Sequence, residues 1–174
     1  MSTLNKGVSK VEVRLKWDPS PLGTPAHDLD IVAATYLATS PHGDPAYLVH
    51  FDSRSPDGTI TLNRDSKNGK GLGDDEVMTL EFDRLSPAFG RVVVGIAIQQ
   101  RDGRITFGDV AGTRVRVVEG YADLAASDFS EVAGSTAAAL GEFVRAGSGE
   151  WHFHPAVRGH DTDPGSFARE MGAS

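Results

Sequence analysis

The chain has 174 residues, a length that suits one domain with a single hydrophobic core. A formal net charge of −7 argues against a nucleic-acid binder, and the lack of cysteine excludes disulfides, thiolate catalysis and cysteine zinc sites. No apolar run approaches the roughly 18 residues of a membrane span, and no secretory signal is visible. We therefore expect a cytoplasmic protein without a direct membrane span.

Short alternating stretches predict β-strands along most of the chain. Residues 11–17 (VEVRLKW) alternate strictly between apolar and charged residues, which is typical of a half-buried strand. Residues 91–99 (RVVVGIAIQ) are apolar on both faces and rich in β-branched residues, which indicates a central strand covered on each side. Further strands are predicted at residues 29–37, 46–51, 59–62, 76–82, 113–119 and 150–155. Turn signals separate them, so the sequence predicts an all-β fold, a two-sheet antiparallel β-sandwich.

One segment does not fit this alternation. Residues 135–146 (STAAALGEFVRA) are rich in alanine, which favours a helix, while Gly141 weakens that interpretation. Their local structure stays open, and a short helical element is possible. We expect a single domain over residues 8–158 and a loosely ordered C-terminal tail over residues 159–174.

A glycine-rich loop at residues 63–77 (NRDSKNGKGLGDDEV) concentrates carboxylates. Carboxylates held this close repel by about 1 kcal/mol per pair at 4 Å even in water. The loop is therefore either a solvated excursion or a cation site. Calcium takes roughly six to eight oxygen ligands in flexible geometry, and a glycine-rich loop can add backbone carbonyls to carboxylates. The candidate metal ligands in this loop are Asp65, Gly71, Asp74, Asp75 and Glu76.

Two familiar loop types do not match. If Asp65 is position 1 of an EF-hand, Lys67 and Gly69 occupy positions that need oxygen ligands, and Lys70 occupies the position of the glycine. The run GKGLGDD lacks the GK[ST] ending of a P-loop, and its acidic end would repel phosphate.

A second acidic pair, Asp28 and Asp30, stands at the start of the strand at 29–37. Residues two apart in a strand project from the same face, and aspartate is depleted in strands. The ordinary alternative is a strand-entry pair without function. We predict that at least one of the two completes a coordination shell with the loop, because consecutive side chains such as Asp74, Asp75 and Glu76 rarely all point at one centre.

Other chemistry is weaker in the sequence. His152 and His154 (WHFH) share one face of a predicted strand and could share a zinc ion. The alternative is an edge strand whose Trp151 and Phe153 face the core while the histidines face water. No GxSxG elbow or positioned general base is present, so we do not expect an enzyme.

Several segments, in this order, resemble the TerD-like family of bacterial tellurium-resistance and general-stress proteins over residues 10–157. They are WD, DLDIVAATYL, SPDG, DSKNGKGLGDDEV, TFGDV and GEFVRAGSGEWHF. The resemblance implies a calcium-binding β-sandwich in which Asp28 and Asp30 match one motif, and Asp65 and Asp74–Glu76 match the loop. It also implies sheet in the later half of residues 135–146.

Four loop positions depart from the family pattern, and two of them, Arg64 for glycine and Ser66 for asparagine, leave the number of carboxylates unchanged. Lys70 stands where the family has glutamate and Leu72 where it has aspartate, so the resemblance implies that one calcium ion binds well and a second weakly. We expect a non-catalytic calcium-binding module of a stress response, with Ca²⁺ as its cofactor, protein partners in a stress-response complex and no nucleic acid. Two alternatives stay open: a small-ligand receptor of the cyclic-nucleotide type, and a metal-dependent hydrolase that uses the acidic cluster.

Overall fold

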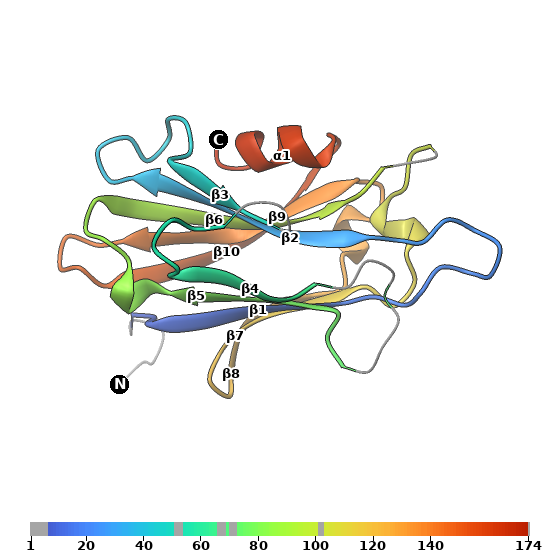
Figure 1. The fold of residues 1–174 in the computed structure, drawn as a ribbon, viewed down its shortest axis with the longest axis horizontal. Helices are drawn as coiled ribbons and strands as arrows, with labels where there is room; N and C mark the ends of the chain where they lie inside the picture. Colours follow the sequence, from blue (N-terminus) through green and yellow to red (C-terminus); the bar gives the residue numbers. More distant parts are fainter. Residues whose placement is uncertain (1–6, 51–53, 66–68, 70–72, 101–102, 174) are drawn as a thin grey trace.

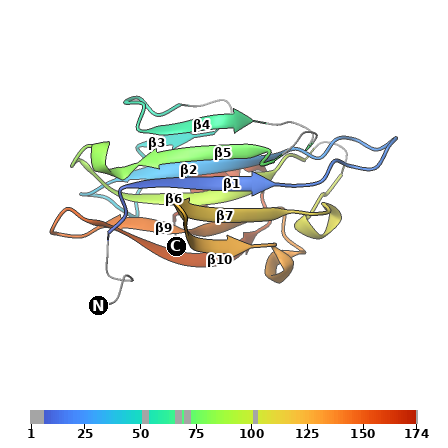
Figure 2. The same ribbon diagram turned by 90° about the horizontal axis from the view of Figure 1, so that it is seen from below.

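The computed structural model describes residues 7–50, 54–65, 69, 73–100 and 103–173, with the backbone alone at residues 64 and 65. Two five-stranded antiparallel sheets pack against each other, which confirms the predicted β-sandwich (Figures 1 and 2). The first sheet has the order β4 (Ile60–Asp65), β5 (Glu76–Glu81), β1 (Lys10–Lys16), β7 (Arg114–Glu119) and β8 (Ala122–Ser127). The second has the order β10 (Trp151–His160), β9 (Ala137–Arg145), β6 (Phe89–Ile98), β2 (Leu29–Leu37) and β3 (Tyr47–Val49). Short 3₁₀ turns are η2 (Phe82–Arg84), η3 (Phe107–Asp109) and η4 (Ser130–Val132).

The core lies between the inner faces of the two sheets. In β1 the alternation places Val11, Val13 and Leu15 inside, all without solvent exposure. The prediction for the central strand is also confirmed. In β6, Val94 packs in the core between the sheets, while Val93 joins a second apolar cluster on the outer face.

The segment left open in the sequence is a strand. β9 covers residues 137–145 of it, including the later half for which the resemblance implied sheet, and pairs with both β6 and β10. β8 was not predicted. It is the edge strand of its sheet, and its side chains are mostly exposed or half-buried. It therefore has no buried face to leave an alternating pattern in the sequence.

The expectation of a loose tail from residue 159 is wrong for the described residues. After β10 the chain forms α1 (Pro164–Glu170), which covers part of the outer face of the second sheet (Figure 1). Asp163 caps this helix by accepting a hydrogen bond from Ser166 N, and Phe167 is fully buried. The helix is ordered by this burial. No helix in the described part of the chain is long and apolar enough to cross a membrane.

Candidate metal centre

The end of β1 and the starts of β2 and β5 lie at one end of the sandwich (right-hand side of Figure 1). β1 runs antiparallel to β5, so the last residues of β1 stand beside the first residues of β5. The second sheet brings the start of β2 to the same end. This arrangement gathers the two acidic segments that the sequence singled out.

Glu76 links the two sheets. Its side chain lies on the inner face of β5 and its Oε1 accepts a hydrogen bond of 2.7 Å from the backbone N–H of Ile31. Among the described residues, β3 pairs with β2 over residues 33–35, and none of them pairs with Ile31 on this side of β2. The Glu76 carboxylate takes the place of a strand partner there, next to Asp30.

Asp75 holds the end of β1. Its Oδ2 accepts a hydrogen bond of 2.9 Å from Trp17 N, and its own N–H donates to Leu15 O. The indole Nε1 of Trp17 donates to the carbonyl of His27 at 3.0 Å. Trp17 therefore connects Asp75 with the segment that leads into Asp28.

Asp74 points elsewhere. Its Oδ2 accepts a 2.9 Å charge-assisted hydrogen bond from Arg14 Nη1, and Glu12 binds the other terminal nitrogen of the same guanidinium. Hydrogen bonds to Asp74 and then to Glu12 raise the pKa of Arg14 above its ordinary value. The three consecutive carboxylates of the loop end thus separate, with Asp74 on the half-exposed outer surface and Asp75 and Glu76 inside.

The buried carboxylates of the described residues are Asp28, Asp30, Asp75 and Glu76, at 7%, 3%, 0% and 0% exposure. A buried charge is costly unless it is paired or coordinates a metal. Asp30 accepts from the Gln99 side chain, and Asp75 accepts from the described residues through Oδ2 alone. Asp75 Oδ1 is buried without a hydrogen bond to any described residue. A buried carboxylate oxygen without a hydrogen bond to a described residue, at the end of the sandwich where three further carboxylates are buried, fits a hard cation, which prefers oxygen ligands.

Gly69 anchors the loop on Trp17. It is buried and has φ +74°, a conformation that favours glycine. A Cβ atom at this position would lie 2.6 Å from Trp17 Nε1 and 3.0 Å from Trp17 O. Only glycine fits so close to Trp17, and Gly69 therefore lies at the same end of the sandwich as the four buried carboxylates.

The structure brings together part of the predicted ligand set. Asp28, Asp30, Asp75 and Glu76 are buried at one end of the sandwich, while Asp74 is bound to Arg14. The backbone of Asp65 pairs with that of Glu76, and its side chain lies outside the described residues, as does Gly71. The described His, Asp and Glu side chains do not by themselves form a group of three or more that could hold a metal ion.

Sequence reasoning missed the supporting residues Trp17, Gln99 and Gly69. Trp17 was recognised as a core residue of the first strand, but its contacts with His27 and Gly69 span the loop and both sheets. Gln99 directly follows β6, whose last pair is Leu29 with Ile98, and this register brings it to Asp30. No local pattern in the sequence encodes that pairing.

His152 and His154 fit the alternative to a zinc site, an edge strand whose Trp151 and Phe153 face the core. Trp151 is buried, and Phe153 stacks on Phe143 at a centroid distance of 4.5 Å. His152 lies 3.6 Å from the Glu150 carboxylate, and His154 is exposed. These two imidazoles form no metal group with other described residues.

A β-sandwich with buried carboxylates at one end defines the class, and comparison with known proteins gives the family. The TerD domain model matches residues 1–170, so the chain belongs to the TerD domain family. Among curated relatives, tellurium resistance protein TerD of Serratia marcescens is 28% identical, with 99% of this chain and 92% of the relative covered. General stress protein 16U of Bacillus subtilis is 27% identical over the same shares.

Solved structures agree with this assignment. A crystal structure of a protein of unknown function superposes with a TM-score of 0.95 at 63% identity, covering 97% of this chain and 99% of that one. A homologue of the telluride resistance protein TerD from Streptomyces coelicolor A3(2) has a TM-score of 0.94 at 57% identity, covering 95% and 98%. The fold is therefore that of known TerD homologues over nearly the whole chain.

Proposed function

We propose that this protein is a calcium-binding, non-catalytic module that acts in the cytoplasmic response to tellurium compounds or to general stress, together with protein partners. The observation that supports the calcium part is the set of four buried carboxylates, in which Asp75 Oδ1 has no hydrogen bond to a described residue. The names of the relatives support the stress part.

Asp75, Glu76, Asp28 and Asp30 would supply carboxylate oxygens to the ion. When bound, calcium neutralises the repulsion among them and joins the loop to both sheets, since these ligands come from the loop end and from β2. A site of this kind has a structural role, because the two sheets and the loop would share one cation. Calcium accepts irregular coordination, whereas magnesium requires a nearly octahedral arrangement of ligands. A site whose ligands come from several segments therefore suits calcium better.

Burial favours a binding role over the hydrolase alternative. A hydrolytic metal needs an open coordination position that substrate and water can reach. The four carboxylates are at most 7% exposed, so a substrate has no direct approach to them. An ion held there would be enclosed by protein ligands.

Calorimetric titration of chelator-treated protein with calcium and magnesium tests the proposal. We expect calcium to bind with a Kd of about 10⁻⁶ to 10⁻⁴ M, the range from sensors to weaker sites, and magnesium to bind much more weakly. At a hundredfold excess over Kd, binding to the native state alone adds about 2.7 kcal/mol to stability. Equal heats for both ions, or a melting temperature that does not change between chelator and calcium, would contradict the proposal.

The variant Asp75→Asn makes the test specific. An amide oxygen can still accept from Trp17 N, but the buried negative charge is gone. We expect calcium affinity to fall by tenfold or more, while the metal-free protein melts at an equal or higher temperature. Asp123→Asn is the matched control, because Asp123 lies exposed on the opposite edge strand of the same sheet.

A further inference from the structure

A cavity of about 370 Å³ lies between the two sheets, on the side of the sandwich where the edge strands β8 and β10 approach each other. Its lining comes from β7, β8 and η4 on one side and from β9 and β10 on the other. Sites for small molecules in proteins measure about 300–1,000 Å³, so this cavity has the size of a ligand site.

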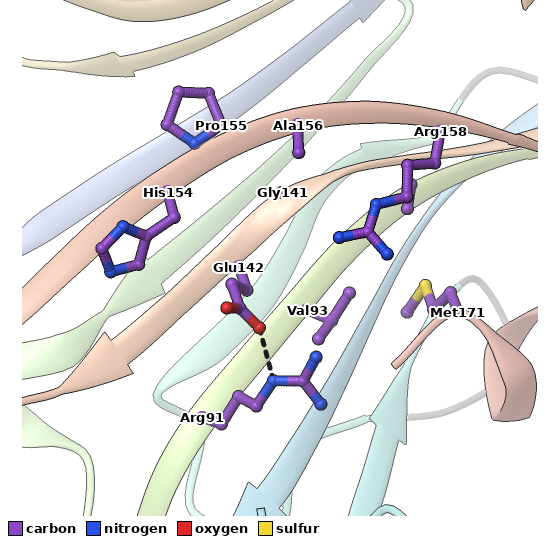
Figure 3. A pocket seen from close by; sticks show the side chains of 10 residues that line it. Arg91, Val93, Gly141, Glu142, His154, Pro155, Ala156, Arg158 and Met171 are labelled. Atoms are coloured by element: carbon purple, nitrogen blue, oxygen red, sulfur yellow. Dashed lines mark hydrogen bonds and ion pairs between the residues drawn. The ribbon is translucent and has the colours of Figure 1, made fainter. Parts of the chain in front are cut away.

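Both edge strands carry a bulge at the cavity. β8 has one residue, Leu124, more than β7 across their pairing, and β10 has two residues, Ala156 and Val157, where β9 has one. Figure 3 shows this part of β10, with Pro155 and Ala156 beside Gly141 of β9. Bulges bend a strand and re-aim its side chains. Two bent edges meet here, which explains why the edge strands do not close the sandwich over the cavity.

The interior of the cavity is apolar. Val115 and Val117 project inward from β7 and Leu140 from β9, each at most 3% exposed. Leu124 and Val157 pack against the same core cluster from the two edge strands. An apolar cavity of about 150 Å³ already holds benzene, so this one has room for an alkyl or aryl body of roughly eight carbon atoms.

The polar part of the lining is acidic. Glu131 is the one charged side chain among the described lining residues, and its Oε1 accepts a 3.2 Å hydrogen bond from Ser127 Oγ. Glu131 is exposed, so the cavity meets solvent beside a carboxylate. Arg114 and Arg116 alternate with the inward valines of β7 and are exposed on the outer face of the sheet, away from the cavity. A ligand that ends beside Glu131 is therefore favoured when that end is positive.

We propose that this cavity binds a small amphipathic ligand with an apolar alkyl or aryl body and a cationic end, such as an ammonium group. The body lies between the sheets and the cation lies beside Glu131. Burial of apolar surface supplies most of the affinity, because an exposed carboxylate adds only a modest attraction. The same carboxylate disfavours an anion such as a cyclic nucleotide. The site shares no residue with the four buried carboxylates of the candidate metal centre.

Calorimetric titration with octylammonium chloride tests the site, with chelator present and methylammonium chloride as the reference for charge alone. We expect saturable binding of octylammonium at millimolar concentration or below. Octanoate, which has a similar body and the opposite charge, should bind at least fivefold more weakly. Glu131→Gln should reduce this preference. Asp123→Asn removes the same charge beside Arg116 on the outer face of β8 and should retain it.

Two alanine variants of β8 test the position of the body. Ala125→Leu fills the cavity, whereas Ala122→Leu adds the same group at an exposed position outside it. We expect Ala125→Leu to weaken octylammonium binding at least tenfold at an equal or higher melting temperature, and Ala122→Leu to bind like the unmodified protein. Methyl NMR signals locate the ligand independently. Octylammonium should shift those of Leu124 and Leu140 and leave that of Val32, on the outer face of the other sheet, in place.

Four results would overturn the proposal. Binding no stronger than that of methylammonium would show that the cavity takes no apolar body. Equal weakening by Ala125→Leu and Ala122→Leu would reduce the effect to adsorption of an amphiphile on the surface. Equal binding of octylammonium and octanoate would remove the cationic end. A dimer in sedimentation that Ala125→Leu dissociates would assign the cavity to a second copy of the chain.

Discussion

Asp74, Asp75 and Glu76 show how one acidic run is divided among different tasks. Asp75 precedes β5 and binds the end of β1, whereas Glu76 begins the strand and faces inward. Asp74 is neutralised on the surface by Arg14. Exposed ion pairs contribute little to stability, about 0–1 kcal/mol, so Asp74 serves mainly to orient the loop end. We therefore expect Asp74→Asn to weaken calcium binding less than Asp75→Asn does.

Gly69 and Gly73 offer a matched pair of variants at the loop. Both have positive φ, +74° and +77°, so alanine strains the backbone similarly at either position. Only at Gly69 would the new Cβ collide with Trp17, while nothing lies within 4 Å at Gly73. We expect Gly69→Ala to weaken calcium binding by at least tenfold more than Gly73→Ala, as measured by calorimetry. Equal effects would mean that the contact with Trp17 does not position the site.

Part of the candidate site could be predicted from residue types. Asp28 and Asp30 are candidates because aspartate is depleted in strands, and Asp75 and Glu76 because the loop concentrates carboxylates; all four are buried. The pairing of Asp74 with Arg14 could not be predicted, because it depends on the register in which Arg14 stands opposite Val77. The roles of Trp17 and Gln99 depend on contacts between distant segments in the same way.

At the scale of elements, apolar alternation predicted strands with one buried face, such as β1, and a continuous apolar run predicted β6, which is buried on both faces. Prediction failed where a buried face is absent, as in β8, or where burial comes from outside the sandwich, as in α1. Gly95, inside the strand β6, is a feature of the sequence that indicates another element packing closely against this face. A Cβ there would lie 2.5 Å from Phe167 Cζ, so the glycine makes room for the Phe167 ring.

Phe167→Ala tests whether α1 belongs to the folded unit. The side chain is fully buried, and truncation of a buried phenylalanine costs about 3–5 kcal/mol. We expect a loss in this range in urea unfolding, with faster amide exchange in residues 164–171. Leu22→Ala, at a fully exposed position, is the control and should leave stability unchanged. A loss below about 1 kcal/mol would indicate a helix that adds little to the fold.

For the whole molecule, the candidate metal centre couples the sheets that form the sandwich. Glu76 already bridges from β5 to β2, and Trp17 connects β1 with His27. A divalent cation shared by these segments would strengthen the same connection and reduce the net charge of −7. Calcium would then act on the stability of the whole fold and on the order of the loop together.

Terbium luminescence tests this account most directly. Terbium(III) accepts the oxygen ligands of calcium and emits when an adjacent tryptophan is excited. The chain has two tryptophans, and Trp17 lies at the candidate centre while Trp151 lies at the start of β10. We predict sensitised emission that calcium displaces, that Trp17→Phe removes and that Trp151→Phe retains. Emission that depends on Trp151 instead, or that calcium does not displace, would contradict a calcium site at the buried carboxylates.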